Sequence, residues 1–115
     1  MKPGVAVILG GAVGTLARAG LAEAWPADPG AWPWATLAVN LAGTALLGWL
    51  VVAHANGWVR PLVGTGFCGA LTTFSTFQVQ LVELADAGRP ALAAAYLAVS
   101  VAAGLLVADL ARRRR

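Results

Sequence analysis

The sequence has very little charge. Only 11% of its 115 residues are Asp, Glu, Lys or Arg, whereas 59% are hydrophobic, and the mean hydropathy is +0.75. A soluble domain carries about a quarter charged residues, and a chain this short has too little interior to bury so much apolar surface. A water-soluble globular fold is therefore excluded, and lipid is the expected solvent for most of the chain.

The sequence also lacks a second cysteine and a dispersed positive charge. Cys68 is the single cysteine, so no disulfide can form within the chain. The formal net charge of +3 would suit a nucleic-acid partner, but four of the eight basic residues form the run Arg112 to Arg115. A basic run beside an apolar segment is typical of a membrane-surface anchor, and we expect no nucleic-acid partner.

Charge is missing from four apolar stretches, residues 3–17, 35–53, 61–82 and 90–108. The predicted spans cover residues 5–21, 35–53, 62–84 and 91–110. A stretch of about 18 residues is long enough to cross a bilayer as a helix. The loops between the spans are too short for a soluble domain. We therefore expect an all-α membrane protein in which residues 1–115 form a single four-span membrane domain.

Small residues recur in the first span. Gly10 and Gly14 are about one helical turn apart, a spacing that lets helix backbones approach closely in lipid. Arg18 continues the same stripe. A charge at such a place either extends to the membrane surface or faces a watery cavity, so Arg18 is a candidate for the lining of an anion vestibule.

The third span carries an unusual polar segment. Three glycines are followed by four hydroxyl residues: Gly64, Gly66, Gly69, Thr72, Thr73, Ser75 and Thr76. The glycine spacing does not indicate a dinucleotide site, because membrane helix flanks it instead of a βαβ unit. Glycine weakens a helix and hydroxyls compete for its backbone bonds, so the helix either breaks here or keeps its hydroxyls bonded to the preceding turn. A break would free carbonyls that need protein or cation partners.

Neutral polar and aromatic side chains are spread over three spans. Phe74 and Phe77 lie three residues apart on one helix face, and an aromatic ring has a positive edge. Asn40 stands among apolar residues, and Tyr96 and Ser100 are four residues apart. These groups either hydrogen-bond between helices or together solvate an anion.

Three motifs together resemble the Fluc/CrcB fluoride channel family. They are Gly-Gly-x-x-Gly-x-x-x-Arg at 10–18, Val-Asn-Leu at 39–41 and Gly-x-x-Thr-Thr-Phe-Ser-Thr-Phe at 69–77. The resemblance covers all four spans in order. It implies a third helix broken in mid-membrane and a passive channel, not an enzyme, through which cytoplasmic fluoride leaves across the cell membrane, so that its toxicity falls.

The resemblance also implies a role for individual residues. The implied fluoride pore consists of Asn40, Phe74, Ser75, Phe77, Tyr96 and Ser100. The backbone carbonyls of Gly69 and Thr72 are implied to hold a structural sodium ion at the centre of an antiparallel dimer, with Arg18 in the vestibule. Gln80 departs from the pattern, because many relatives are expected to carry an acidic residue near this position.

The positions of the basic residues indicate which partner the chain would have in that dimer. Lys2, Arg60 and Arg112 to Arg115 are expected on one side of the membrane, and Arg89 on the other, joined by Arg18 if it reaches the interface. An excess of Lys and Arg on one side favours a fixed orientation, whereas self-pairing in inverted orientation needs a chain that inserts both ways. The expected partner is therefore either an inverted copy of this chain or an inverted paralogue.

Two other functions suit a small four-span protein. A proton-coupled cation or drug exporter needs a carboxylate inside the bilayer. The acidic residues of this chain lie at span ends or in loops: Glu23, Asp28, Glu83, Asp86 and Asp109. A non-conducting membrane assembly subunit is the other alternative, and it would not need Asn40, Phe74 and Phe77 together.

Overall fold

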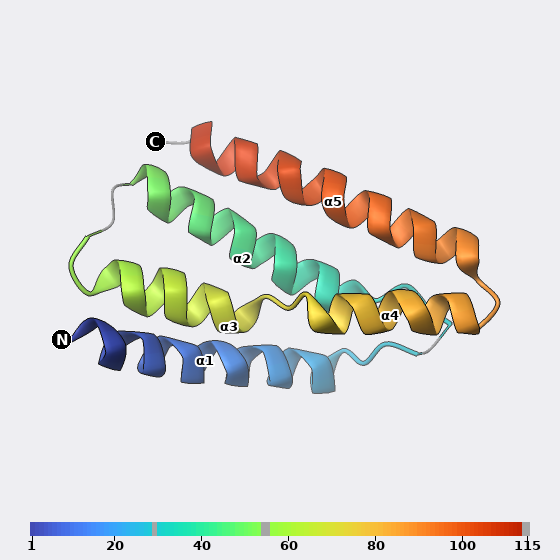
Figure 1. Ribbon diagram of the computed structural model, residues 1–115, viewed down its shortest axis with the longest axis horizontal. Helices are drawn as coiled ribbons and strands as arrows, with labels where there is room; N and C mark the ends of the chain where they lie inside the picture. The colour runs from blue at the N-terminus through green and yellow to red at the C-terminus, as the bar shows by residue number, and fades with distance from the viewer. Residues whose placement is uncertain (29, 54–55, 114–115) are drawn as a thin grey trace.

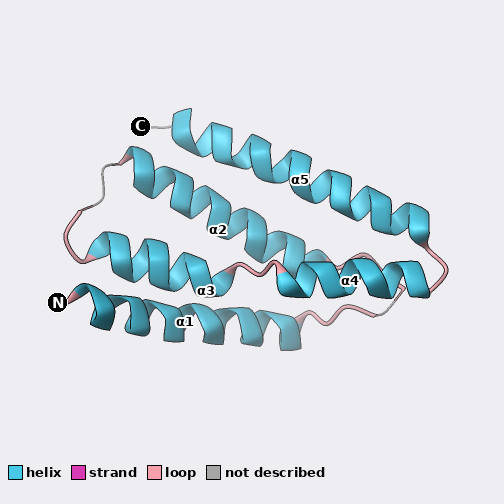
Figure 2. Cartoon of the chain, in the orientation of Figure 1, coloured by secondary structure: helices cyan, strands magenta, loops and turns pink. Residues whose placement is uncertain are grey.

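The computed structural model describes residues 1–28, 30–53 and 56–113. The helices are α1 (Pro3–Ala24), α2 (Trp34–Val52), η1 (Arg60–Cys68), α3 (Gly69–Leu71), α4 (Ser75–Asp86) and α5 (Pro90–Arg113). Within the described ranges the chain is helical apart from loops and turns, and its long helices run side by side (Figures 1 and 2). Three of them, α1, α2 and α5, are long and apolar enough to cross a membrane. The all-helical prediction is confirmed, and the helix ends lie close to the predicted ones.

The third helical stretch is interrupted halfway along. Thr72 has φ −78° and ψ 152°, which is extended backbone, and helix resumes only at Ser75. Before the break, η1 has the wide turns of a π-helix, in which a backbone N–H bonds five residues back, as Gly69 does to Gly64. The break was predicted from the resemblance, whereas nothing in the sequence pattern predicted the π-type winding.

Glycines hold α1 directly against the first half of this broken helix. A Cβ atom added at Gly10 would collide with the Leu62 carbonyl oxygen, and one at Gly14 with the Phe67 carbonyl oxygen. From the opposite side, a Cβ at Gly66 would lie 2.7 Å from a carbonyl oxygen of α1. Backbone therefore packs on backbone, as the spacing of Gly10 and Gly14 predicted.

The apolar core lies on the other side of the molecule, between α2, α4 and α5. It is formed by Leu37, Phe77, Leu84 and Tyr96, and Tyr96 is fully buried. Trp32, in the loop before α2, packs on this cluster with its ring 5.4 Å from the Tyr96 ring. The break thus separates a glycine-packed contact from a contact built of large side chains.

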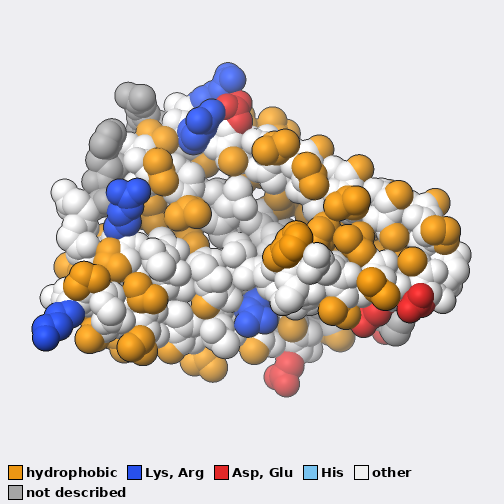
Figure 3. Space-filling view, viewed as in Figure 1, with side chains coloured by type: hydrophobic (Ala, Val, Ile, Leu, Met, Phe, Trp, Pro, Cys, Tyr) orange, Lys and Arg blue, Asp and Glu red, His pale blue; other side chains and the backbone are white. Residues whose placement is uncertain are grey.

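Most of the charged side chains lie near the two ends of the molecule, apart from Arg18, which reaches the break. Both termini lie at one end in Figure 1, and the α2–η1 connection lies there too. The basic residues at this end are Lys2, Arg60, Arg112 and Arg113. Glu23, Glu83 and Asp86 lie at helix ends on the opposite side, and hydrophobic side chains cover much of the surface between (Figure 3). Arg114 and Arg115 fall outside the described residues.

Candidate functional site

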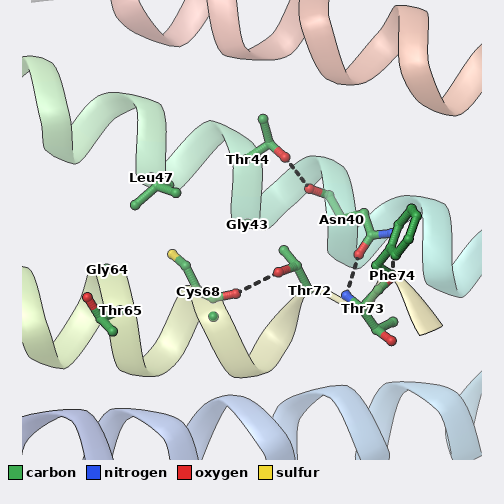
Figure 4. Close-up of a pocket in the computed structure, with 11 residues that line it drawn as sticks. Asn40, Gly43, Thr44, Leu47, Gly64, Thr65, Cys68, Thr72, Thr73 and Phe74 are labelled. Carbon is green, nitrogen blue, oxygen red and sulfur yellow. Dashed lines mark hydrogen bonds between the residues drawn. The ribbon is translucent and has the colours of Figure 1, made fainter. Parts of the chain in front are cut away.

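At the break, the side chain of Asn40 makes hydrogen bonds that another turn of the helix would otherwise make. Its Oδ1 accepts a hydrogen bond of 2.8 Å from the Thr73 backbone N–H, and its Nδ2 donates to the Thr73 carbonyl at 3.1 Å. Figure 4 shows this amide reaching from α2 to the extended backbone. A primary amide presents the same donor and acceptor as a peptide group, so it can pair with both polar groups of one residue. Asn40 therefore fixes the break from the α2 side.

This pairing changes the hydrogen bonding of the carbonyls before the break. In an unbroken helix the Thr73 N–H would bond to the Gly69 carbonyl, four residues back, but here it bonds to Asn40. The next carbonyl, that of Ala70, accepts a hydrogen bond of 2.9 Å from Arg18 Nε. The break is thus supported from α1 as well as from α2, and the Gly69 carbonyl is left without its helical donor.

A wide groove of about 530 Å³ runs between α2 and the broken helix. Its lining, drawn in Figure 4, consists of Asn40, Gly43, Thr44, Leu47, Gly64, Thr65, Cys68, Gly69, Thr72, Thr73 and Phe74. Thr44 and Thr72 donate their hydroxyls to the carbonyls four residues back, at 2.7 and 2.9 Å. In both residues the hydroxyl donates to a carbonyl of its own helix, so its hydrogen does not point into the groove.

Four of the predicted pore residues meet in a second cavity of about 200 Å³. Asn40, Phe74, Phe77 and Ser100 all line it, together with apolar residues and Thr44 from α2 and α5. None of its described lining residues is acidic or basic. The Ser100 Oγ is buried and has no hydrogen-bond partner in the part of the chain that the structure describes. This cavity therefore offers an amide, a free hydroxyl and two aromatic rings, with no fixed charge.

The two phenylalanines differ strongly in exposure. Phe74 is 70% exposed and Phe77 7%, although their ring centroids are only 6.1 Å apart. Phe77 rests on Tyr96 at 5.0 Å, and the Tyr96 hydroxyl donates to Gln80 Oε1 at 3.0 Å. Tyr96 lines neither of these two cavities, so it supports Phe77 from behind. Gln80 provides the acceptor that a carboxylate would also provide at this place.

Two other predicted residues lie elsewhere. Ser75 begins α4, is exposed, and lines none of the described cavities. Arg18 does not line the wide groove but a separate cavity of about 60 Å³ on the α1 side of the break. Sequence reasoning missed the central position of Thr73, whose backbone holds Asn40. A solitary Asn in one apolar span, beside a polar segment in another, was the available signal.

Gly69 and Thr72, the residues expected to hold sodium, both line the wide groove. Gly69 is exposed there, and no atom lies within 4 Å of where its Cβ would be. Carbonyl oxygens are suitable ligands for a hard cation, and the Gly69 carbonyl has lost its helical donor. Among the described residues no group of three or more His, Cys, Asp or Glu could hold a metal. The residues present therefore suit a cation bound by backbone oxygen.

Comparison with known proteins shows the family of this chain. Residues 5–111 match the family described as CrcB-like protein, Camphor Resistance (CrcB). A Mycolicibacterium paratuberculosis protein named fluoride-specific ion channel FluC 1 is 45% identical over 113 aligned residues, and the match covers 94% of this chain and 86% of the relative. A Mycobacterium bovis protein of the same name is 46% identical (92% and 84%), and a Bordetella petrii protein named fluoride-specific ion channel FluC is 42% identical (92% and 85%). The chain therefore belongs to the CrcB-like family, as its three motifs indicated, and is a membrane protein of a family of ion channels and not an enzyme.

Proposed function

We propose that this chain forms a passive, fluoride-selective ion channel that exports cytoplasmic fluoride and so lowers its toxicity. The observation that carries the proposal is the uncharged cavity lined by Asn40, Phe74, Phe77 and Ser100. The names of the relatives support the choice of ion, because all three are called fluoride-specific. The proposal treats this cavity as part of the pore.

The chemistry of the cavity suits fluoride. Fluoride is small and strongly hydrated, so a pore must replace its water with hydrogen-bond donors while avoiding a full positive charge that would trap the ion. The Asn40 amide has two N–H hydrogens, of which one is bonded to the Thr73 carbonyl, and the other can donate to an anion. The Ser100 hydroxyl and the ring edges of Phe74 and Phe77 add further positive partial charge.

The remaining predicted residues have supporting parts in this proposal. Ser75, at the exposed start of α4, would contact the ion at the edge of the pore. Tyr96 would hold Phe77 in place from behind, with its hydroxyl bonded to Gln80. Arg18 would keep the vestibule near the break electrically positive.

The driving force requires no coupled ion. Fluoride enters cells as neutral HF and dissociates in a more alkaline cytoplasm, which traps the anion. A negative-inside potential then drives fluoride outward through a passive pore, by about 2.3 kcal/mol per charge for each 100 mV. The proposed location is accordingly the cell membrane, where the protein is multi-pass.

The proposed channel includes a structural sodium ion. The carbonyls of Gly69 and Thr72 would hold it in the wide groove, where the Gly69 carbonyl has lost its helical donor. When bound, the ion would neutralise carbonyl oxygens that lipid cannot satisfy. Two carbonyls are too few for a hard cation, which takes about six oxygen ligands, so further ligands would come from a second chain.

That second chain would lie antiparallel to the first. The proposed partner is an inverted copy of this chain or an inverted paralogue. The wide groove with the exposed Gly69 supports a partner on this face, since lipid would leave its polar backbone unsatisfied. The basic end formed by Lys2, Arg60, Arg112 and Arg113 favours a fixed orientation and hence the paralogue. An intact set of Asn40, Phe74 and Phe77 in one chain favours the homodimer.

A proton-coupled exporter is less well supported. It needs a carboxylate within the membrane, yet no acidic residue lines any of the three cavities among the described residues. Purified protein in liposomes separates the alternatives. Fluoride efflux read with an ion-selective electrode should be fast without a pH gradient, and chloride efflux should stay at the level of empty liposomes. Equal chloride flux, or flux that needs a proton gradient, would refute the proposal, and no anion flux would indicate an assembly subunit.

A further inference from the structure

Gly43 of α2 lies against Thr72, the residue at which the third helical stretch leaves helical geometry. A Cβ atom added at Gly43 would collide with Cγ2, the side-chain methyl group of Thr72. The next atoms that the described residues place there are Thr72 Cβ at 3.8 Å and the Cys68 carbonyl oxygen at 3.9 Å, both at ordinary van der Waals distance. The glycine therefore makes room for one methyl group, whereas Gly10 and Gly14 make room for a neighbouring backbone.

The Thr72 methyl group is not free to turn away from α2. The Cys68 carbonyl oxygen accepts two hydrogen bonds from Thr72, one from the backbone N–H at 3.1 Å and one from the hydroxyl at 2.9 Å. A β-branched side chain has few allowed χ1 rotamers, and rotation of this one would take the hydroxyl away from Cys68. Figure 4 shows the Thr72 hydroxyl directed at Cys68, while the methyl group is directed at Gly43. The methyl group thus occupies a slot that the missing side chain of Gly43 leaves open.

The position of Thr72 decides the direction of a proposed sodium ligand. The Thr72 carbonyl and the Thr73 N–H belong to one planar trans peptide group, so they point in opposite directions. Asn40 Oδ1 accepts the hydrogen bond of the Thr73 N–H at 2.8 Å, which fixes one end of this group. The slot at Gly43 and the two bonds to Cys68 fix the other end at Thr72. Together these contacts hold the Thr72 carbonyl in one orientation.

We infer that Gly43 is a positioning residue of the proposed cation site, which orients the Thr72 carbonyl through the Thr72 side chain without binding the ion itself. The inference rests on the proposed function, in which the carbonyls of Gly69 and Thr72 hold sodium. Groups that orient the ligands of a metal change its affinity by about ten- to a hundredfold when they are replaced. The competing interpretation is that Gly43 serves only to pack α2 on the broken helix.

The affinity for sodium can be measured without any flux. The protein is purified in choline chloride, and its melting temperature in detergent is followed as sodium replaces choline at constant ionic strength. A ligand that binds the folded state alone raises the melting temperature, and the concentration at which the rise begins reports the dissociation constant. Gly43→Ala should shift this sodium concentration upward by about tenfold, because the new Cβ displaces the Thr72 methyl group from its slot.

A second substitution separates positioning from packing. Thr72→Ser keeps the hydroxyl that bonds to Cys68 but empties the slot, so it should weaken sodium binding by a smaller factor. Gly43→Ala combined with Thr72→Ser should bind sodium more tightly than Gly43→Ala, because the alanine Cβ then takes the place of the lost methyl group. Gly48→Ala is the matched control on α2, since its Cβ would lie 3.0 Å from Ala111 of α5 and Gly48 lines none of the three cavities. It should lower the melting temperature and leave the sodium concentration unchanged.

Each outcome decides between positioning and packing. Wild-type sodium affinity in Gly43→Ala would overturn the inference and leave the sodium site in place, and if this variant does not fold, Thr72→Ser decides in the same way. A loss in Gly43→Ala that Thr72→Ser does not rescue would also overturn it, because Gly43 would then serve packing alone. A wild-type melting temperature that does not respond to sodium would refute the proposed sodium site and the inference with it. Fluoride efflux from wild-type liposomes tests the proposed conduction separately.

Discussion

The two sides of the break are packed in opposite ways. On the α1 side, glycines bring backbone onto backbone, and a single added Cβ at Gly10 or Gly14 would collide with a carbonyl oxygen. On the α2 and α5 side, a groove of about 530 Å³ and a cavity of about 200 Å³ remain between the helices. Glycine closes the α1 side, whereas on the other side the groove is lined mainly by small residues and the cavity by Phe74 and Phe77 among others.

This difference shows how a broken helix can be rigid and still leave space for an ion. The glycine-packed α1 side (the tight side) fixes the position of η1 and α3, and Arg18 donates to the Ala70 carbonyl just before the break. On the α2 and α5 side (the open side), Asn40 makes two hydrogen bonds to Thr73, and Gly43 lies directly against Thr72. The tight side should therefore govern stability, and the open side should govern conduction.

The largest effect is expected from a methyl group on the tight side. Gly14→Ala should lower the free energy of unfolding in detergent by about 3 kcal/mol, because the new Cβ collides with backbone that cannot move aside. Gly20→Ala is the control, since no atom lies within 4 Å of its Cβ position, and alanine there favours the helix. Denaturant titration followed by size-exclusion chromatography measures both. Equal stability of the two variants would mean that the tight side is looser than described.

The next effect is expected at the contact that joins the two sides. Asn40→Asp keeps the acceptor for the Thr73 N–H but removes the donor for the Thr73 carbonyl and adds a negative charge beside the proposed pore. Stability should fall by about 2 kcal/mol, and fluoride efflux should be lost. Asn56→Asp, on an exposed residue in a turn, should behave as the wild type. Efflux from Asn40→Asp liposomes at the wild-type rate would separate Asn40 from conduction.

The smallest effect on stability is expected from the aromatic residues of the open side. Phe74→Ile and Phe77→Ile remove the polarised ring edge, so fluoride efflux should fall about tenfold in both. Folding should hardly change in Phe74→Ile, at an exposed ring, whereas Phe77→Ile in the core should cost about 1 kcal/mol. Phe67→Ile is the matched control, because Phe67 lines none of the cavities. Efflux rates of the three variants in liposomes decide the point. Wild-type rates in both Phe74→Ile and Phe77→Ile would make these residues ordinary packing.

The tight side could be predicted from the sequence more fully than the open side. Helix packing through Gly10 and Gly14 depends on local spacing, which the sequence displays directly. The long helices could also be predicted, because the length of an apolar run is visible directly in the sequence. The break did not follow from spacing, because a helix whose hydroxyls bond to the preceding turn satisfies the same pattern. At Thr72 that local bond does form, although the backbone then leaves the helix.

The candidate site depends on contacts between distant segments, which no local pattern encodes. The amide of Asn40 meets Thr73, thirty-three residues away, and Arg18 meets Ala70, fifty-two residues away. Sequence reasoning chose Asn40 as a donor to an anion, and the structure adds that half of its hydrogen-bonding capacity holds the backbone. Gln80 was noted as a departure from the family, and its bond with Tyr96 gives the neutral amide a structural partner.

Passive conduction of fluoride through the open side can be measured electrically. The most direct test is the reversal potential of the current through purified protein in a planar bilayer. Under a tenfold fluoride gradient we expect a reversal potential of about 59 mV, the value for a monovalent ion that passes alone. Adding a tenfold chloride gradient or a pH gradient should leave this value unchanged. A reversal potential near zero, or one that follows chloride or protons, would contradict the account.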